Sequence, residues 1–277
     1  MRSFGLGITN SDLNQIPART TELSIDLAEK KIFQLINQER EGKGLVALAW
    51  NDDLANVARS YSQYLARENE VFTGFGVSCD YPLIHHQAEW FGPGASDRLK
   101  QFGVNYFSRV GENLALVSAV DLKISFVAGD PIKEKLDSCA AEREELDTAF
   151  REKLEAASGT EEKLKVVAAE IKKRKNAFKD ILTAKVVETR WHTAEEIAVE
   201  MVDGWMASPG HRKNILEAQF DESGVGVAIV NTYIIATQIF IKRADCGFAG
   251  GPCCEKEGYY PYCFIPLECQ ANQCVDQ

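Results

Sequence analysis

The feature that most constrains this chain is the crowding of cysteine near its C-terminus. Six of the eight cysteines in the 277-residue sequence stand close together among glycine and proline, namely Cys246, Cys253, Cys254, Cys263, Cys269 and Cys274. None of them forms the CxxC pairs of a zinc ribbon, so the cluster predicts a disulfide framework. Because such frameworks persist only in oxidising compartments, we expect an extracellular or cell-surface protein. A cytosolic protein with free thiols is the alternative.

The N-terminal segment and the charge narrow the choice of partners. Residues 1–20 are polar and lack the apolar core of a secretory leader, so we interpret them as a flexible arm and expect a leader to have been removed before residue 1. No stretch approaches the roughly 20 apolar residues of a transmembrane segment. The formal net charge of −10 disfavours nucleic acid and anionic lipid as partners.

Two amphipathic helices open the main domain. Apolar residues recur at helical spacing over residues 23–40, which predicts the first helix. A second helix is expected to start near Asn51 or Asp52, either of which can cap it, and to run through Leu65. Residues 71–96 are rich in glycine, proline and aromatics, which predicts an irregular loop before a short helix at residues 97–102.

The segment from about residue 130 to 187 differs in character. Asp130-Pro131 is typical of a helix start, and Ser158-Gly159 divides two narrow apolar stripes with a capping box to Glu161. The pattern predicts an antiparallel helical hairpin, either solvated and packed on itself or acting as a partner-binding arm. Cys139 lies on the first stripe, where it is either buried or bridged to Cys79.

The sequence in the last third of the domain predicts a helix and a β-hairpin. A helix over residues 194–206 precedes two β-rich runs, residues 224–230 and 233–240, and Asn231-Thr232 between the runs predicts a turn. Helices that precede a late hairpin indicate an α+β domain.

Three dispersed residues carry the candidate chemistry. His86 falls in the loop, Glu112 follows a glycine, and His211 falls in the first turn of a helix that Ser208 caps and Pro209 begins. Two histidines and a glutamate are a known zinc-ligand set. The alternative is that the histidines are ordinary surface or hydrogen-bonded residues. The sequence contains no HExxH and no GxSxG motif.

Four motifs in order resemble the CAP superfamily of cysteine-rich secretory, antigen 5 and pathogenesis-related proteins, in its bacterial and archaeal form. The resemblance covers roughly residues 23–120 and 193–242. The motifs are Leu35-Ile36-Asn37-Gln38-Glu39-Arg40 with Trp50-Asn51, Asp97-Arg98-Leu99 with Gly111-Glu112-Asn113-Leu114, Gly204-Trp205 with Ser208-Pro209-Gly210-His211, and Gly224-Val225-Gly226-Val227 with Thr237-Gln238-Ile239-Phe240.

The resemblance implies a three-layer α-β-α sandwich whose central cleft carries two histidines and two acids, with zinc or another divalent metal as the expected cofactor. The second histidine is then His211 and the first acid is Glu112. The first histidine is His86, with His85 as the close alternative. Asn113 and Ser208 complete the implied cleft, and Ser208 stands where relatives carry the second acid.

The expected organisation has five parts: an arm at 1–20, the CAP domain at 21–129 and 188–244, an inserted helical hairpin at 130–187, and a cysteine-rich tail at 245–277. The expected function is non-enzymatic, the binding of a divalent metal and of an extracellular protein, peptide or small apolar ligand. One alternative is a zinc-dependent hydrolase or protease with Glu112 as general base. The other alternative is a secreted protein that binds lipid or sterol.

Overall fold

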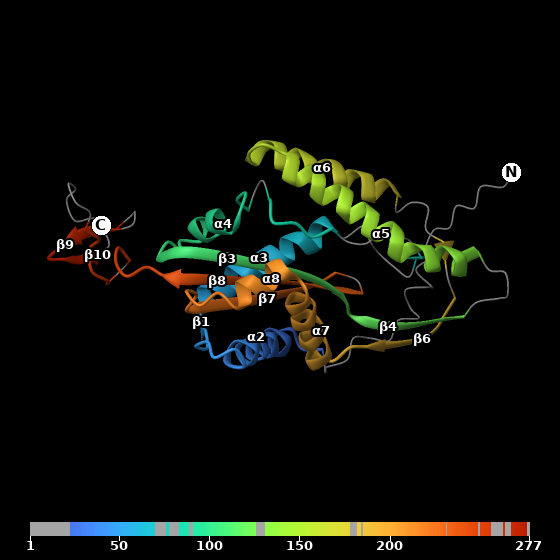
Figure 1. Cartoon of the computed structure of the whole chain (residues 1–277), viewed down its shortest axis with the longest axis horizontal. Helices are drawn as coiled ribbons and strands as arrows, with labels where there is room; N and C mark the ends of the chain where they lie inside the picture. The colour runs from blue at the N-terminus through green and yellow to red at the C-terminus, as the bar shows by residue number, and fades with distance from the viewer. Residues whose placement is uncertain are drawn as a thin grey trace.

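The computed structural model describes residues 23–69, 76–77, 83–88, 91–125, 131–177, 182–183, 185–230, 232–248, 250–255, 263 and 267–275. Its centre is a four-stranded sheet in the order β1-β7-β8-β3 (Figure 1). The strands are β1 (Ala49–Trp50), β7 (Glu222–Val230), β8 (Tyr233–Arg243) and β3 (Phe107–Ser118). The predicted hairpin is confirmed, since Val230 pairs directly with Tyr233 across a two-residue loop.

Helices cover both faces of this sheet, which gives three layers. Helices α2 (Ile25–Glu41) and α7 (Ala194–Ala207) pack on one face, and α3 (Asp52–Glu68) packs on the other. The side chains of β8 divide by strict alternation. Ile234, Ala236 and Phe240 join the first layer, whereas Ile235, Ile239 and Ile241 join the second. The predicted α+β sandwich is therefore the observed fold.

Local sequence accounts for the helix boundaries. The side chain of Asn51 accepts a hydrogen bond from the Leu54 amide at 3.1 Å and so caps α3 as predicted. Thr193 and Glu196 form a complete capping box at the start of α7. Two short helices complete the domain, α4 (Ala95–Gln101) and α8 (Pro209–Ile215).

Glycine permits a close approach between α3 and β7. A Cβ built on Gly226 would collide with the backbone of Arg59, and the Ser62 hydroxyl donates to the Gly226 carbonyl at 2.8 Å. Only a residue without a side chain lets a helix lie this close to a strand. The Gly224-Val225-Gly226-Val227 motif is thus a packing requirement.

The inserted hairpin is present, but it is shorter than predicted. Helices α5 (Pro131–Ala156) and α6 (Thr160–Ala177) turn at Gly159, whose φ is +83°. Glu162, rather than Glu161, accepts the hydrogen bonds from Ser158.

The prediction of helix as far as Val187 is wrong. Residues 185–191 form β6 (Lys185–Trp191), which pairs with β4 (Val120–Ser125), and β5 (Leu182–Thr183) pairs with β2 (Gly76–Val77). A run with three β-branched residues, Val186, Val187 and Thr189, prefers a strand once a partner strand is available.

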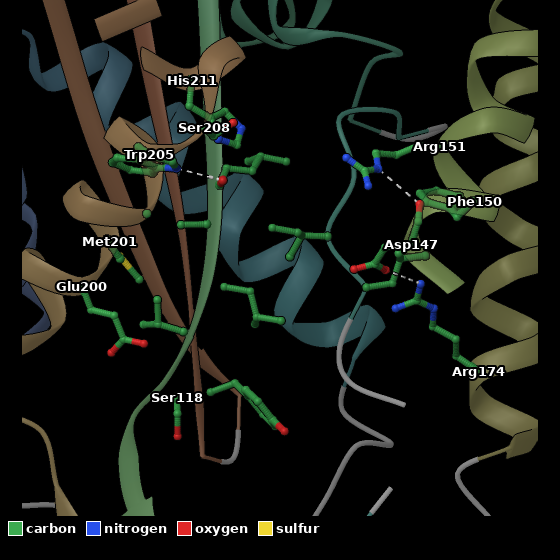
Figure 2. A pocket seen from close by; sticks show the side chains of 18 residues that line it. Ser118, Asp147, Phe150, Arg151, Arg174, Glu200, Met201, Trp205, Ser208 and His211 are labelled. Carbon is green, nitrogen blue, oxygen red and sulfur yellow. Dashed lines mark hydrogen bonds and ion pairs between the residues drawn. The ribbon is translucent and has the colours of Figure 1, made fainter. Parts of the chain in front are cut away.

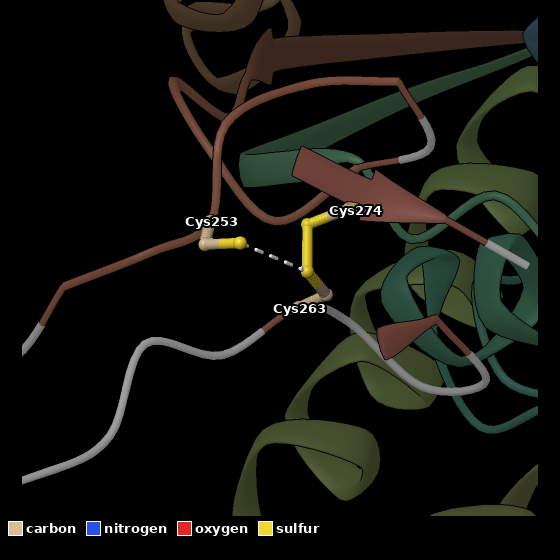
Figure 3. A group of neighbouring side chains, drawn as sticks. All are labelled: Cys253, Cys263 and Cys274. Atoms are coloured by element: carbon tan, nitrogen blue, oxygen red, sulfur yellow. Dashed lines mark hydrogen bonds between the residues drawn. A yellow bond between two sulfur atoms is a disulfide. The ribbon is translucent and has the colours of Figure 1, made fainter. Parts of the chain in front are cut away.

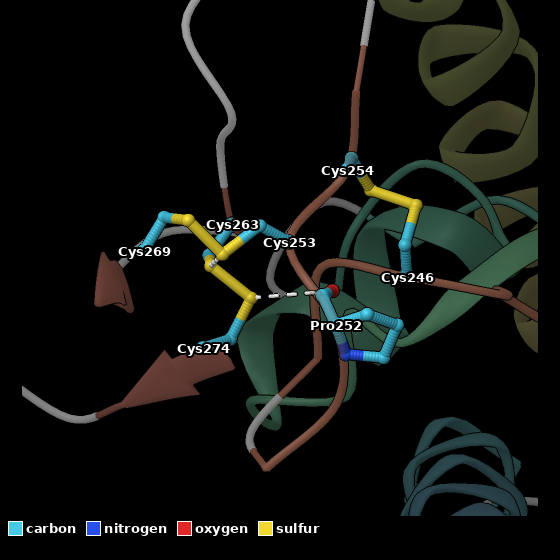
Figure 4. The surroundings of a disulfide bond; sticks show 7 residues. All are labelled: Cys246, Pro252, Cys253, Cys254, Cys263, Cys269 and Cys274. Carbon is cyan, nitrogen blue, oxygen red and sulfur yellow. Dashed lines mark hydrogen bonds between the residues drawn. A yellow bond between two sulfur atoms is a disulfide. The ribbon is translucent and has the colours of Figure 1, made fainter. Parts of the chain in front are cut away.

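The tail is bridged by three disulfides, Cys246–Cys254, Cys253–Cys269 and Cys263–Cys274 (Figure 4). The adjacent Cys253 and Cys254 do not pair with each other, as expected. A small hairpin of β9 (Glu268–Gln270) and β10 (Gln273–Val275) closes the tail, and Figure 1 shows it beyond the end of β8. Cys79 lies outside the described residues, so its predicted bridge to Cys139 stays a prediction.

Candidate functional site

The loop at residues 83–88 is fixed by the end of α3. The side-chain amide of Asn69, the residue that follows α3, donates to the Leu83 carbonyl at 3.0 Å and accepts from the Leu83 amide at 2.9 Å. Tyr61 of α3 donates to the carbonyl of His85 at 2.5 Å. These hydrogen bonds fix the backbone on which both candidate histidines stand.

The two neighbouring histidines point in different directions. His85 is buried, and its Nε2 lies 2.8 Å from a carboxylate oxygen of Glu68. His86 is 44% exposed at its side chain, and its Nδ1 lies 2.7 Å from Oε1 of Glu112. His86 is therefore the histidine beside Glu112, and His85 belongs to the interior.

Glu112 has both carboxylate oxygens engaged. One oxygen contacts His86, and the other pairs with the guanidinium of Arg98, which is fully buried. Arg98 also donates to the carbonyl of His86 at 3.0 Å and lies over the ring of Tyr61 at 3.6 Å from the ring centroid. This buried arginine holds Glu112 and the histidine loop together, a role that its sequence motif does not reveal.

His211 reaches the same region from α8. Asn113 of β3 donates to the His211 carbonyl at 3.2 Å, and Asn214 donates to the Asn113 side chain at 2.9 Å and to the Glu112 carbonyl at 3.1 Å. Asn113 is buried and anchors α8 to β3. Asn214 was not among the predicted site residues, although its place one turn after the histidine in the same motif was an available signal.

Burial lowers the pKa of the His211 imidazole, and the nearby charge of His86 lowers the pKa further. Removal from water disfavours the charged imidazolium, and a second imidazole of like charge adds repulsion. The lowered pKa favours the neutral form of the His211 imidazole, which is the form that can bind a metal.

The donors fit a two-histidine metal site only in part. An Nδ1 bonded to a carboxylate leaves Nε2 of His86 as the ligand atom, which is the usual arrangement of a metal-bound histidine. Within the described residues, however, the ligand atoms of His86, Glu112 and His211 do not all lie within 4.8 Å of one another. Ser208 offers no acid at the fourth position. The chemistry of the donors is thus that of an imidazole oriented by a carboxylate, with His86 as the oriented histidine and Glu112 as the orienting carboxylate.

A cavity of about 730 Å³ adjoins His211 (Figure 2). Ser208 and His211 lie at one end, α7 forms one wall, and residues 114–118 of β3 line its length. The far wall comes from the inserted hairpin, through Asp147, Phe150, Arg151 and Arg174. These hairpin residues were not predicted to line the cleft, because nothing in a local pattern shows what a hairpin packs against.

A second group of candidate metal ligands lies in the tail. The sulfur atoms of Cys253, Cys263 and Cys274 lie within 4.8 Å of one another (Figure 3). All three are in disulfides, with Cys253 bonded to Cys269 and Cys263 bonded to Cys274. Metal binding by cysteine needs a thiolate, so this group is a disulfide cluster.

The fold is a three-layer α-β-α sandwich whose edge strand β3 carries a carboxylate paired with a histidine. Sequence comparison identifies the family. The cysteine-rich secretory protein family, CAP, matches residues 33–110 and 161–240, more than half of the chain. The chain belongs to this family. The residues between the two matches hold Glu112, the rest of β3, β4 and α5.

Individual relatives share parts of the chain. The protein YkwD of Bacillus subtilis is 32% identical over 92 residues, which are 33% of this chain and 30% of that protein. An extracellular protein from Bacillus anthracis with an SCP domain has a TM-score of 0.42 at 20% identity, over 86% of this chain and 45% of its own. An outer surface protein of Borrelia burgdorferi has a TM-score of 0.42 at 14% identity, over 80% of this chain and 96% of its own. This chain thus spans less than half of the first two proteins.

Proposed function

We propose that this protein is a secreted CAP domain that binds a divalent metal, zinc or a similar ion, and an extracellular ligand in the cleft beside His86 and His211. The observation that carries the proposal is the His86–Glu112 pair. It orients one imidazole, whose Nε2 bonds to no other group among the described residues, and burial lowers the pKa of the second imidazole, which favours the neutral, ligating form. Three disulfides and the absence of a membrane-crossing helix among the described residues are compatible with secretion.

A binding role fits Glu112 better than a hydrolytic role. A bound zinc ion supplies Lewis acidity and an acidic water. A general base, in turn, needs a carboxylate oxygen free to take a proton. Both oxygens of Glu112 are occupied, one of them by a buried arginine that never loses its charge. Glu112 therefore orients His86 and is a weak candidate for the base of a hydrolase.

Metal analysis tests the proposal. Purified wild type, His86→Ala and His211→Ala are titrated with zinc by calorimetry and assayed for bound metal. The control is His192→Ala, because the carboxylates beside its ring nitrogens belong to Asp121 and Glu200 and not to Glu112. We expect one site in the wild type and the control, and a loss of at least about tenfold in affinity in each cleft variant. Equal uptake by all four proteins contradicts the proposal.

A further inference from the structure

The open edge of β3 lies inside the cavity. Strand β3 pairs with β8 on one side only, and among the described residues no strand pairs with its other side. Five successive residues of β3, 114–118, line the cavity, so the space runs along this edge. Figure 2 shows β3 passing between α7 and the hairpin, with the hairpin side chains across from it.

Alternation along β3 shows which backbone groups point into the space. The Ala119 amide donates to the carbonyl of Thr232, the residue just before β8. The backbone amides and carbonyls of the odd-numbered residues of β3 therefore point toward β8. The backbone amides and carbonyls of the even-numbered residues point away from β8. In agreement, the carbonyls of Glu112 and Leu114 accept hydrogen bonds from the side chains of Asn214 and Trp205, respectively. The amide and carbonyl of Leu116 therefore point into the cavity, and no side chain of the described residues bonds to them.

This backbone limits what can fill the cavity. An aliphatic chain against β3 would leave the amide and carbonyl of Leu116 without partners, and each such group costs free energy when it is removed from water. An extended peptide presents a matching amide and carbonyl at the strand spacing. Its side chains would then alternate between α7 and the loop at Leu83 and Ile84.

The charge of the cavity wall that the hairpin forms places a second requirement on the ligand. Arg174 is neutralised there by Asp147 at 3.0 Å and by Glu170 at 3.1 Å. Arg151 is exposed and, among the described residues, bonds only to the Asp147 carbonyl and the Thr148 hydroxyl. A guanidinium without a carboxylate partner favours a ligand that brings its own carboxylate.

We propose that the cavity binds an extended peptide as an added strand beside Leu116 of β3, with an acidic side chain or a C-terminal carboxylate toward Arg151. This peptide is the ligand class for the extracellular ligand of the proposed function. The peptide proposal rests on the proposed function only in placing the ligand in the same cleft. Metal is not required for this pairing, because Leu116 and Arg151 contact the peptide without the histidines. Tests in the presence and absence of EDTA therefore separate the two proposals.

The probe is a fluorescein-labelled hexapeptide, Val-Thr-Val-Thr-Val-Asp, with a free C-terminus, whose binding to the full chain is followed by anisotropy. We expect saturable binding with Kd below about 1 mM, with or without EDTA. Leu116→Pro removes the outward amide of an edge strand and is expected to weaken binding at least about tenfold. Leu116→Ala keeps the amide and is the matched control. Arg151→Glu should weaken binding by a similar factor, whereas Lys153→Glu on the same helix should not.

Hydrogen exchange of the wild type tests the pairing without any variant. Peptide binding should slow exchange of the Leu116 amide and leave the Val117 amide, already paired with β8, unchanged. The proposal is overturned if the hexapeptide does not bind, if Leu116 gains no protection, or if palmitate displaces the peptide and binds Leu116→Pro as well as wild type. Peptide binding that survives while zinc uptake is absent refutes only the metal proposal.

Discussion

Nδ1 of His86 lies 2.7 Å from Oε1 of Glu112, and the second oxygen of the same carboxylate pairs with the buried guanidinium of Arg98. One side chain thus joins an exposed imidazole to a cation that has no access to water. Histidine orientation and local stability therefore depend on the same carboxylate.

Glu112→Gln should destabilise the protein by about 3–5 kcal/mol, because it leaves the buried Arg98 without a counter-charge. The measurement is urea unfolding at pH 7. The double variant Arg98→Met/Glu112→Gln should recover part of the loss, since it removes the unpaired charge as well. A single variant within about 0.5 kcal/mol of wild type contradicts the arrangement.

Stability should depend on pH through His211. Burial lowers the pKa of this histidine in the folded state below the unfolded value, so protonation favours unfolding. Stability is then greatest above about pH 6.5, the ordinary histidine pKa, and falls as the pH drops toward the lower folded value. Unfolding curves from pH 8 to 5 should show a smaller decline in His211→Asn than in wild type. Parallel curves would show that His211 is not the group that titrates.

Substitution by alanine should change the free energy of unfolding in opposite directions at Gly226 and Gly204. Gly226→Ala forces a methyl group into the backbone of α3 and should cost about 3 kcal/mol or more. Gly204 lies within α7 with nothing near its Cβ position, so Gly204→Ala should stabilise by about 0.5–1 kcal/mol. Thermal unfolding of both variants beside wild type checks the pair, and equal signs would refute the α3–β7 packing.

The inserted hairpin should be removable at its base. Ser125 and Lys185 are direct partners in the β4–β6 ribbon, so an Asn-Gly turn can replace residues 126–184. We expect this variant, with Cys79→Ser, to fold with a lower Tm, because Leu83 loses its contacts with Phe150 and Val167. Circular dichroism and cooperative unfolding measure the result. A chain that fails to fold would make the hairpin part of the core.

The tail should contain no free thiol in secreted material. Because Cys253 and Cys254 are adjacent in the chain, the three bridges remain linked in one cluster, and stepwise partial reduction with alkylation should assign them as Cys246–Cys254, Cys253–Cys269 and Cys263–Cys274. Removing the first bridge with Cys246→Ser/Cys254→Ser should leave the other two intact and the core Tm nearly unchanged, since the tail lies beyond β8 (Figure 1). A different connectivity on the map would contradict the structure.

Sequence patterns predicted the elements whose signals are local. The cap at Asn51, the β7–β8 hairpin and the hairpin turn at Gly159 all follow from neighbours in the chain. The strand at residues 185–191 was misassigned because Phe178 and Ile181 continue the helical stripe. Its partner β4 lies some sixty residues away, and such pairing leaves no local signal.

The site was only partly predictable for the same reason. Motif resemblance selected Glu112 and His211, but the choice between His85 and His86 depended on Glu68, which takes His85 into the interior. Burial of Arg98 and the hairpin wall at Phe150 and Arg151 arise from tertiary packing. A residue's neighbours in space cannot be deduced from its neighbours in sequence.

The wall opposite β3 has a consequence for how such proteins diverge. The histidines and Glu112 stand on the shared scaffold, whereas Phe150 and Arg151 stand on an insertion joined to it through a narrow ribbon. Under the proposed function, substitutions in the insertion would change the shape and charge of the accepted ligand without disturbing the scaffold. On that proposal, two members of the family with identical histidines would select unrelated ligands wherever their insertions differ, and a ligand found for one would be a poor guide to the ligand of another.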